Sequence, residues 1–570
     1  MNKKITSGSS NFLSLIENNE YYVDKTRFIG ELENLNYKFV FFLRPRRFGK
    51  SLFLSLLEYY YDVKHYDKFD LLFREYYIGS NPTVLKNSYF ILKFNFSGIS
   101  TDENHGVKES FDNSVRASLR DFLYGYSIAS ENEIEENLKT RGSADILRNC
   151  LSLFRKYKSG SKIYVLIDEY DHFTNELFSF DRRHFRDIVS QNGWIRKFYE
   201  VIKIGIGEGL IDRFFATGVT PVTLDDLTSG FNIATNLTTD EYFHEICGFD
   251  ETEISDFIKS TFTDSSEIDF NILFKDLRSW YNGSKFSPDA SKKLYNPQLI
   301  ISFLNKYSRN LKYPREMNDY NVTSDRKKIS LLIDSLPSET ADSVLDEIFT
   351  KEVIEGGLTM QFSPDAAYTR QDAVSLLFYN GLLTIEDFTA GVFRFSIPNY
   401  VIKNIYWDFF RNRYESENNL SLSSGETAEI FREMAFDGYI RKLVQKVEEV
   451  MKNLSNNDFR NFSESNLKMI LISILSANPV YQIKSELEIS TGRVDLLLKR
   501  NKAYEAVFQY LVEFKFIKVK DEVRFEKIKE EGILQLKRYL ESDDIRSMDN
   551  LRSFLIIFHN KIEGEIIEVR

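Results

Sequence analysis

Charged side chains alternate with apolar ones along two short segments near the end of the sequence. Gly492-Arg493-Val494-Asp495 is followed by Glu513-Phe514-Lys515. Because neighbouring side chains of a strand point to opposite faces, Glu513 and Lys515 would share one face, with Phe514 on the other. Carboxylates bind Mg²⁺, which activates water and neutralises charge on a phosphate. The pattern therefore indicates metal-assisted phosphodiester hydrolysis, with Asp495 and Glu513 as metal ligands and with Asp495, Glu513 and Lys515 as catalytic residues.

Three further features fit the same interpretation. Glu486, together with Glu488, precedes Asp495 on an expected strand and could supply another metal ligand. Gln535 lies on the inward stripe of an expected helix, where a polar group needs a partner such as a metal-site neighbour or a phosphate. Glu464 could approach the site, although favouring a helix N-terminus through the dipole is the simpler interpretation. An ordinary surface hairpin would also explain the spacing from Asp495 to Glu513 and Lys515 if that spacing were the only evidence.

A second constellation lies near the N-terminus, where Arg44-Pro45-Arg46-Arg47-Phe48-Gly49-Lys50-Ser51 follows an apolar strand and opens a helix. A phosphate-binding loop needs backbone N–H groups aimed at phosphate, a lysine that reaches the β and γ oxygens, and a hydroxyl on Mg²⁺. Lys50 and Ser51 supply the last two, but Arg44 stands where the generic pattern has its first glycine. A basic turn before a helix is the alternative. The residues expected to bind the nucleotide here are Arg46, Arg47, Phe48, Gly49, Lys50, Ser51 and Leu52.

The acids that such a loop requires are Asp168 and Glu169, which stand at the end of another apolar strand. Asp168 would hold Mg²⁺ through water, and Glu169 would be the catalytic residue that polarises the attacking water. Thr217 ends the next expected strand and could contact the γ-phosphate of the nucleotide. A strand end capped by two solvated acids is the alternative, and the lysine loop upstream weighs against it.

The elements that would position these residues alternate between strands and helices. Apolar runs predict strands at 37–43, 88–96, 163–167 and 214–217, and helical spacing predicts helices at 52–61 and 194–202. Continuous apolar strands joined by helices are typical of a parallel sheet covered on both faces. Residues 1–245 are therefore expected to form an α/β domain of the P-loop NTPase type.

The remainder divides into two further expected domains. Residues 246–415 show mostly helical patterns with short strand candidates, and residues 426–453 look like a charged helical connector. The elements expected after the connector are a helix at 466–476, strands at 494–498 and 511–516, a helix at 525–540 and a strand at 553–558. Residues 416–570 are therefore expected to form a second α/β domain.

The composition bounds the class of protein. The chain has 570 residues, 42% hydrophobic and 28% charged, which is globular rather than disordered. Its two cysteines rule out a disulfide framework or a cysteine-rich zinc site. No apolar run reaches the ~18–20 residues of a membrane span, and the polar N-terminus has no signal-peptide pattern. A cytoplasmic location without a membrane partner is therefore expected.

A net charge of −11 argues against a uniformly basic surface for nucleic acid, but a local basic patch would be sufficient for binding. Cations cluster at two places, which are Arg182, Arg183 and Arg186, and Lys499, Arg500 and Lys502. A solvated face is the simpler interpretation of each cluster. The second cluster lies beside the strands of the expected phosphodiesterase site, so it could contact phosphates.

Several motifs resemble those of the bacterial AAA-ATPase-like family, namely Tyr22-Val23-Asp24-Lys25-Thr26, the segment from Arg44 to Leu52, and Asp168-Glu169-Tyr170-Asp171. Further motifs of that family match Thr217-Gly218-Val219, Trp280-Tyr281-Asn282-Gly283 and Tyr295-Asn296-Pro297. The resemblance implies that Arg44 is a family trait and that ATP with Mg²⁺ is the cofactor, with binding implied more firmly than hydrolysis. It would put Asp24 and Lys25 near the nucleotide, although capping a helix at Thr26 fits them equally well. Since AAA-type sites often need a neighbouring subunit, a homo-oligomer is also open.

The C-terminal residues Ser485-Glu486, Gly492 to Asp495, Glu513 to Lys515 and Gln535 resemble, in that order, the pattern of a PD-(D/E)XK nuclease domain. This resemblance implies a restriction-endonuclease-like α/β fold and Mg²⁺-dependent cleavage of DNA. The two resemblances together predict an ATP-regulated DNA nuclease. The alternatives are an ATP-dependent switch or assembly protein that uses a catalytically silent nuclease fold to bind DNA, and a motor ATPase acting on nucleic acid.

Overall fold

The computed structural model describes two compact units. The first comprises residues 1–305, 331–348 and 352–399, and the second comprises residues 306–330, 349–351 and 400–570. The described residues are all of the chain apart from 1–2, 7, 102–105, 141, 181, 190–192, 224–230, 263–267, 319–324, 335, 363–366, 419, 423, 454–461 and 560–563. Within them, no helix is long and apolar enough to cross a membrane. The expected division into three domains at residues 245 and 415 stays a prediction.

The first unit is built on a five-stranded parallel sheet with the strand order β2-β3-β4-β1-β5. Its strands are β1 (Phe39–Leu43), β2 (Phe90–Asn95), β3 (Ile163–Asp168), β4 (Ile211–Gly218) and β5 (Thr235–Asn236). Every residue of β3 is buried, as a strand covered on both faces requires. The predicted parallel α/β sheet is therefore confirmed, with β5 as an additional short strand.

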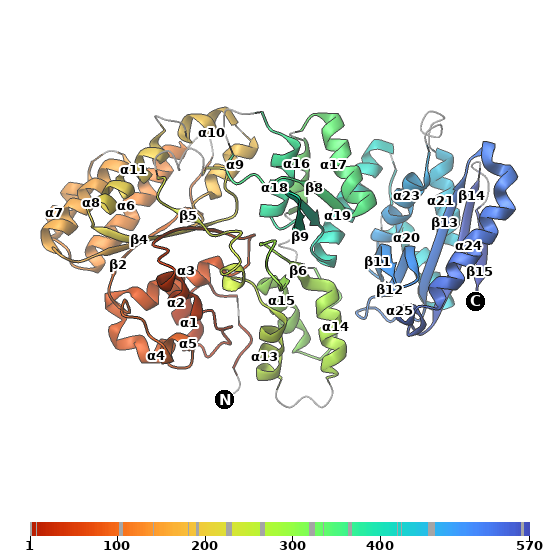
Figure 1. Ribbon diagram of the computed structural model, residues 1–570, viewed down its shortest axis with the longest axis horizontal. Helices are drawn as coiled ribbons and strands as arrows, with labels where there is room; N and C mark the ends of the chain where they lie inside the picture. The colour runs from red at the N-terminus through yellow and green to blue at the C-terminus, as the bar shows by residue number, and fades with distance from the viewer. Residues whose placement is uncertain are drawn as a thin grey trace. The chain divides into compact units, whose positions relative to one another are not determined.

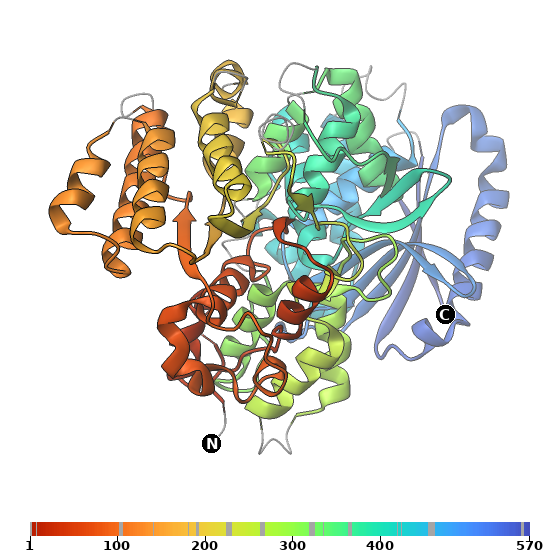
Figure 2. The ribbon, with the colours of Figure 1, turned by 60° about the vertical axis from the view of Figure 1, so that its left-hand side comes forward.

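Helices lie on both sides of this sheet. Figure 1 shows α3 (Lys50–Tyr61) below the strands, and α6 (Val107–Gly125), α8 (Ser143–Tyr157) and α11 (Trp194–Gly207) above them. Figure 2 shows α6 and α8 stacked with the short α7 (Glu131–Leu138) as one orange group. The other helices of this region are α1 (Phe12–Glu17), α2 (Arg27–Asn34), η1 (Val63–Lys68), α4 (Phe69–Phe73), α5 (Tyr77–Ser80), α9 (His172–Phe180) and α10 (Arg182–Val189).

Strand register brings three predicted site segments together. Leu43 pairs with Gly218, and Ile167 pairs with Ala216, so β1, β3 and β4 end side by side. The carboxyl ends of parallel strands lie at one edge of the sheet, where ligands bind in open α/β folds. The loop after Leu43, the acids after Ile167 and Thr217 therefore share that edge.

The rest of the first unit is mainly helical and carries two small sheets. One sheet pairs β6 (Asn282–Ser284) with β7 (Leu294–Tyr295), and the other has the order β8-β10-β9. The strands of the second are β8 (Val353–Gly356), β9 (Thr384–Thr389) and β10 (Val392–Ser396). The helices around them are η2 (His244–Ile246), α13 (Glu251–Thr261), α14 (Phe270–Tyr281) and α18 (Arg370–Tyr379). The helices α15 (Pro297–Tyr307), α16 (Asp325–Asp334) and α17 (Ser338–Lys351) have residues in both units.

The second unit contains a five-stranded mixed sheet in the order β11-β12-β13-β14-β15. Its strands are β11 (Tyr481–Ile489), β12 (Gly492–Arg500), β13 (Gln509–Ile517), β14 (Leu551–His559) and β15 (Glu565–Val569). Only β13 and β14 pair in parallel, while the other neighbours are antiparallel. This mixed α/β sheet agrees with the predicted fold class.

Two apolar layers cover the two faces of the mixed sheet. Val512 and Phe514 belong to the layer that contains α23 (Glu464–Ser476), whereas Leu511 belongs to the layer that contains α24 (Phe525–Leu540). Figure 1 shows these two helices on opposite sides of the strands. The alternation predicted for β13 is therefore confirmed. The other helices of this unit are α19 (Tyr400–Asn418), α20 (Ser424–Arg432), η4 (Glu433–Asp437), α21 (Arg441–Asn453), η5 (Val519–Arg524) and α25 (Asp543–Arg546).

The interpretation of residues 426–453 as a connector is wrong. Ile430, Met434, Val444 and Val447 are buried in the layer around α23. Charged residues gave the segment its connector-like composition, yet one of them, Glu448, is also buried and accepts a hydrogen bond from the backbone N–H of Gly564. These helices are part of the core of the second unit.

Candidate functional site

The loop between β1 and α3 has the geometry of a phosphate-binding loop. Gly49 has a φ of 99°, a left-handed conformation that glycine adopts without steric cost, and α3 begins at the next residue. The buried ammonium of Lys50 donates hydrogen bonds to the backbone oxygens of Arg44 at 2.8 Å and Pro45 at 3.0 Å. The loop thus curls around the lysine, while the N-terminus of a twelve-residue helix faces the same place.

Arg44, which replaces the first glycine of the generic loop, is a buried structural anchor. Its guanidinium donates hydrogen bonds to the backbone oxygens of Leu43, Thr238, Phe243 and His244. The same group lies over the rings of Phe42 and Phe286. Arg44 therefore ties the end of β1 to the segment after β5, and it does not line the adjoining cavity.

The predicted acids lie directly beside this loop. The hydroxyl of Thr217 donates a hydrogen bond of 2.7 Å to Oδ1 of Asp168, and both residues are buried. Oε2 of Glu169 lies 3.2 Å from Nδ1 of His172, which is in turn 3.3 Å from the guanidinium of Arg46. The hydrogen bond with His172 lowers the pKa of Glu169 and raises that of His172. Glu169 is therefore held as a carboxylate beside two basic groups.

Asp171 fixes the strand ends behind these acids. Its buried carboxylate accepts hydrogen bonds from the backbone N–H groups of Val219 and Thr220 and from the side-chain amide of Asn175. Gly218 is required at this point because a Cβ there would lie 2.4 Å from Oδ1 of Asp171. The match of Asp171 and Gly218 to the family motifs thus has a structural explanation.

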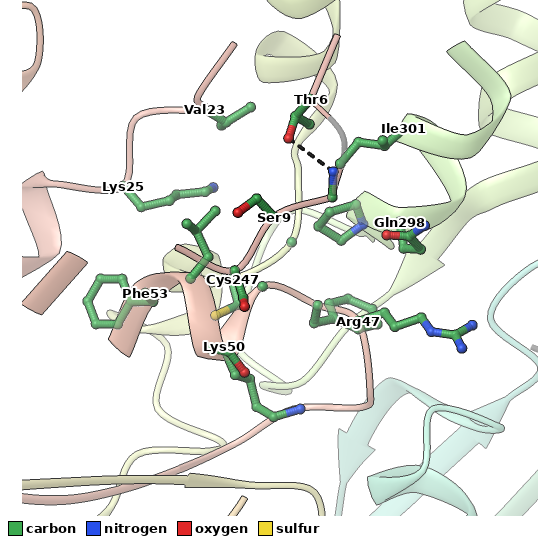
Figure 3. Close-up of a pocket in the computed structure, with 18 of the residues that line it drawn as sticks. Thr6, Ser9, Val23, Lys25, Arg47, Lys50, Phe53, Cys247, Gln298 and Ile301 are labelled. Carbon is green, nitrogen blue, oxygen red and sulfur yellow. Dashed lines mark hydrogen bonds between the residues drawn. The ribbon is translucent and has the colours of Figure 1, made fainter. Parts of the chain in front are cut away.

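A cavity of about 440 Å³ opens beside the loop, and Figure 3 shows the side chains around it. Its walls come from the N-terminal segment, the loop, residues 246–249 and the start of α15. This volume lies in the usual range for small-molecule sites. Of the residues predicted to bind nucleotide, those that line it are Arg46, Arg47, Phe48, Gly49, Lys50, Ser51 and Leu52, and Glu169 lines it as well. Asp168 and Thr217 are not part of its lining.

The two interpretations of Asp24 and Lys25 apply to different residues. Asp24 accepts hydrogen bonds from the backbone and hydroxyl of Thr26 and from the backbone N–H of Tyr77, so it organises the entry to α2. Lys25 instead lines the cavity, where its ammonium lies 2.6 Å from Oε1 of Glu253. Of these two residues, only Lys25 is therefore in a position to contact a ligand in the cavity.

In the second unit, strand pairing gathers the predicted acids in one row. Ser485 pairs with Leu496 and Leu487 pairs with Val494, which sets Glu486 opposite Asp495. Leu496 pairs with Val512 on the other side, and continuing that register by one residue sets Asp495 opposite Glu513. The backbone N–H of Phe514 donates to Oδ2 of Asp495 at 3.2 Å. Three neighbouring strands therefore bring Glu486, Asp495 and Glu513 to adjacent register positions.

Lys515 and Glu513 form the closest pair of this row. The ammonium of Lys515 lies 2.7 Å from Oε1 of Glu513 and 3.9 Å from Oδ2 of Asp495. Burial and the neighbouring Asp495 carboxylate raise the pKa of Glu513 to about 8. Burial also raises the pKa of Asp495, although Lys515 opposes that shift. Two carboxyl groups this close resist being charged together unless a cation joins them.

Glu486 has an unusual conformation and is engaged by two cations. Its φ of 53° lies in the left-handed region, which is rare inside a strand and often marks a functional site. Its carboxylate lies 3.0 Å from the buried ammonium of Lys468 and 2.7 Å from the guanidinium of Arg493. Glu486 therefore adjoins Asp495 but is not an open ligand. The side chain of Glu488 lies outside the described residues.

The remaining predicted neighbours have defined partners. Gln535 donates a hydrogen bond to the hydroxyl of Tyr539, which donates to the backbone oxygen of Arg493. The hydrogen-bond partner expected for the inward-facing Gln535 is thus Tyr539, which links α24 to β12. Glu464 is the first residue of α23, and its Oε1 also accepts a hydrogen bond of 3.5 Å from the backbone N–H of Phe516. It therefore serves the helix terminus and also lies beside the strand that carries Lys515.

The donor set of the second unit fits a hydrated divalent cation. Oε2 of Glu513 is buried and has no hydrogen-bond partner within the described part of the chain. No group of three or more potential ligands is gathered tightly enough to enclose a metal, again among the described residues only. Mg²⁺ commonly uses one or two carboxylates and completes its octahedron with water and phosphate oxygens. Asp495 and Glu513 match that mode of binding.

Sequence reasoning missed His172, Lys468 and Tyr539. His172 follows Glu169 by three residues, and this spacing is a local signal that their side chains can form a hydrogen bond. Lys468 lies on α23, eighteen residues before Glu486, and no local pattern links the two. The side chains of Arg182 and Arg183 in the first basic cluster lie outside the described residues.

Comparison with known proteins gives two matching families. Residues 6–228 match the model of the AAA-ATPase-like family, described as a predicted AAA-ATPase, and residues 462–566 match the PD-(D/E)XK nuclease superfamily. An uncharacterized protein in the vnfD 5′ region of Azotobacter chroococcum mcd 1 is 26% identical over 320 residues, or 53% of this chain. The chain spans about half the length of that relative, at 52%.

Proposed function

The chain carries an AAA-ATPase-like domain at residues 6–228 and a PD-(D/E)XK nuclease superfamily domain at residues 462–566, and from this we propose that it is an ATP-regulated, Mg²⁺-dependent DNA nuclease. ATP would bind in the cavity beside the loop of residues 44–51, and phosphodiester bonds would be cleaved at Asp495, Glu513 and Lys515. The observation that carries the proposal is the second of these sites, where the ammonium of Lys515 lies 2.7 Å from Glu513 and 3.9 Å from Asp495 on the adjacent strand.

In the ATP site, the residues have separable roles. Lys50 would leave the carbonyl oxygens of its own loop for the β- and γ-phosphates, and the backbone of residues 46–51 would cradle the phosphates. Ser51 and Asp168 would hold Mg²⁺, which supplies neutralising charge between the phosphates. Thr217 would orient Asp168 rather than contact the nucleotide, since its hydroxyl is already donated to that carboxylate. Glu169 would polarise the attacking water, with His172 keeping it ionised.

The apolar part of the same cavity suits a nucleobase. Tyr21, Val23, Ile246, Phe249 and Ile301 contribute apolar surface to it, beside the backbone of the N-terminal segment. Small-molecule sites typically combine such walls with a few polar groups that fix orientation. Gln298 and Lys25 are the side chains that could supply those polar contacts to the base or ribose.

In the nuclease site, Asp495 and Glu513 would hold Mg²⁺, which lowers the pKa of bound water and neutralises charge on the scissile phosphate. Glu486 would join them only after leaving Lys468 and Arg493. Lys515 would keep the nucleophilic water in place, because its ammonium is fixed between both carboxylates. Glu464, next to the same strand, would help to orient this lysine.

The experiment is a plasmid-cleavage assay with and without ATP, run on the wild type, Lys50→Ala and Asp495→Asn. The proposal expects Mg²⁺-dependent cutting that Asp495→Asn abolishes and that responds to ATP only when Lys50 is present. Cutting that survives Asp495→Asn would reject the chemistry. Cutting by Lys50→Ala that responds to ATP as the wild type does would reject the proposed regulation.

A second candidate is an ATP-dependent switch or assembly protein that uses a silent nuclease fold to bind DNA. The ion pairs that engage Glu486 favour it, because they leave two rather than three carboxylates open for a metal. This candidate predicts that the wild type binds DNA but never cuts it, under any divalent cation.

A further inference from the structure

A groove in the second unit lies outside both proposed sites. One wall consists of residues between Lys306 and Arg315, and the other consists of residues between Arg500 and Ala506. The groove has a volume of about 780 Å³. Its second wall is the connection from β12 to β13, the two strands that carry Asp495 and Glu513.

Cations dominate the lining of this groove. Its charged residues are one glutamate, Glu505, and five cations, Lys306, Lys312, Arg315, Arg500 and Lys502. The chain as a whole has a net charge of −11, so this concentration of positive charge departs from the average surface. A concave surface lined by one sign of charge focuses the electrostatic field and attracts the opposite charge. The groove is therefore suited to a polyanion.

The aromatic residues of the groove have partners within its walls. The ammonium of Lys502 lies over the ring of Tyr313, 5.4 Å from its centroid, and that ring also packs edge-on against Tyr307. The hydroxyl of Tyr504 donates a hydrogen bond of 3.5 Å to the backbone oxygen of Arg315. Because these rings are engaged within the walls, the groove offers positive charge rather than open rings on which bases could stack.

Arg500 and Lys306 are engaged by oxygen atoms instead of by rings. Its guanidinium donates to the backbone oxygen of Val507 at 3.0 Å and lies 2.5 Å from Oδ1 of Asp549. Lys306 donates a hydrogen bond of 3.4 Å to the backbone oxygen of Glu316. Lys312, Arg315 and Lys502 are the exposed cations of the lining. These three residues are the ones that a ligand would meet first.

We propose that this groove binds the phosphodiester backbone of a nucleic acid, without regard to base sequence. Cations without open aromatic faces beside them contact phosphates, which position a nucleic acid but carry no sequence information. The inference takes its partner from the proposed nuclease function and extends that function by a second contact. Arg500 and Asp495 are five residues apart on β12, or roughly 16 Å along the strand. A nucleic-acid strand covers that distance with about five nucleotides, at about 3.4 Å each.

The test measures binding of a fluorescent duplex of about 30 base pairs, roughly three helical turns, and of a single strand of the same length. The full chain is used in the Asp495→Asn background, so that cleavage cannot interfere. The groove variant combines Lys312→Gln, Arg315→Gln and Lys502→Gln. Each phosphate contact contributes to the slope of log affinity against log salt by about 0.9 for a duplex and by about 0.7 for a single strand. Removing three contacts should therefore lower the slope by about 2.7 for the duplex and by about 2.1 for the single strand.

Two sets of variants control for charge and folding. Lys452→Gln, Lys527→Gln and Lys537→Gln remove three exposed cations of the same unit that do not line the groove, and they should leave the slope unchanged. Lys312→Arg and Lys502→Arg keep the charge and should bind as the parent does. Thermal unfolding of each variant, compared with that of the parent chain, shows whether the fold is intact.

The outcomes separate this inference from the proposed function. Groove-dependent binding of either nucleic acid supports the inference even if the wild type never cuts DNA, in which case only the nuclease proposal fails. An equal slope for the groove and control variants overturns the inference, whether or not the chain is a nuclease. Binding of polyglutamate that depends on the groove, without binding of either nucleic acid, would also overturn it.

Discussion

The ammonium of Lys515 lies 2.7 Å from Oε1 of Glu513, while Oε2 of the same carboxylate is buried without a hydrogen-bond partner in the described part of the chain. A buried carboxylate oxygen without a partner costs free energy. A divalent cation shared with Asp495 would satisfy that oxygen and would remove the repulsion between the two acids. When both acids are ionised, the arrangement is therefore incomplete without a cation, and several predictions depend on it.

Stability without metal should fall as the pH rises toward 8. The pKa of Glu513 is raised from 4.5 to about 8, so its contribution to stability is full below pH 4.5 and is lost as the pH passes through about 8. In EDTA, the melting temperature of the wild type should therefore decline between pH 6 and 9 more than that of Glu513→Gln. Equal declines would mean that Glu513 does not titrate in this range. Thermal unfolding across this pH series is the measurement.

Binding of Mg²⁺ should release a proton near neutral pH. Glu513 is largely protonated at pH 7 in the free protein, and a metal ligand must be ionised. Titration calorimetry in two buffers of different ionisation enthalpy counts the protons released. Glu513→Gln should release fewer protons and bind Mg²⁺ more weakly. Proton release that is identical in this variant would contradict the assignment of Glu513 as a ligand.

Removing the hydroxyl of Thr217 should impair ATP turnover more than ATP binding. Thr217 contacts Asp168 and not the cavity, and losing such an orienting hydrogen bond typically costs about 10–100-fold in activity. Thr217→Val should therefore lower kcat for ATP hydrolysis while leaving nucleotide affinity near that of the wild type, and Thr217→Ser should restore turnover. A large loss of affinity with unchanged kcat would mean that the threonine contacts the nucleotide itself.

Glu486 should contribute to stability in the absence of metal. Breaking a fully buried ion pair costs about 3–5 kcal/mol, and because Glu486 is partly exposed we expect Glu486→Gln to cost about 1–3 kcal/mol. The double variant Glu486→Gln with Lys468→Met should recover part of this loss, since no buried ammonium is left without its partner. Chemical denaturation in EDTA measures both effects. A Glu486→Gln variant as stable as the wild type would favour a role in metal binding alone.

Much of the fold and of the candidate site could be predicted from local sequence patterns, because the alternation of side chains along a strand is a local property. The period of two put Glu513 and Lys515 on one side of β13, and the structure has Leu511 and Val512 in opposite apolar layers, as that period requires. The run of apolar residues before Asp168 likewise predicted a fully buried strand. What these patterns could locate was the position of each acid along its own strand.

Contacts between distant segments could not be predicted in the same way. The role of Arg44 depends on backbone oxygens about 200 residues later in the chain, which no motif encodes. The pairing of Lys468 with Glu486 requires knowing where α23 packs, and the left-handed conformation of Glu486 has no signal in a residue of its type. The segment of residues 426–453 was misjudged for a related reason, because its charged faces concealed a buried stripe.

The most direct test of the central claim is the rate at which plasmid DNA is cut in Mg²⁺ by the wild type and by Asp495→Asn. If Asp495 and Glu513 hold the cation that cleaves the phosphodiester, the wild type should cut in Mg²⁺ but not in EDTA, and the asparagine variant should be inactive while still folded. Cutting by Asp495→Asn at the rate of the wild type would contradict the claim.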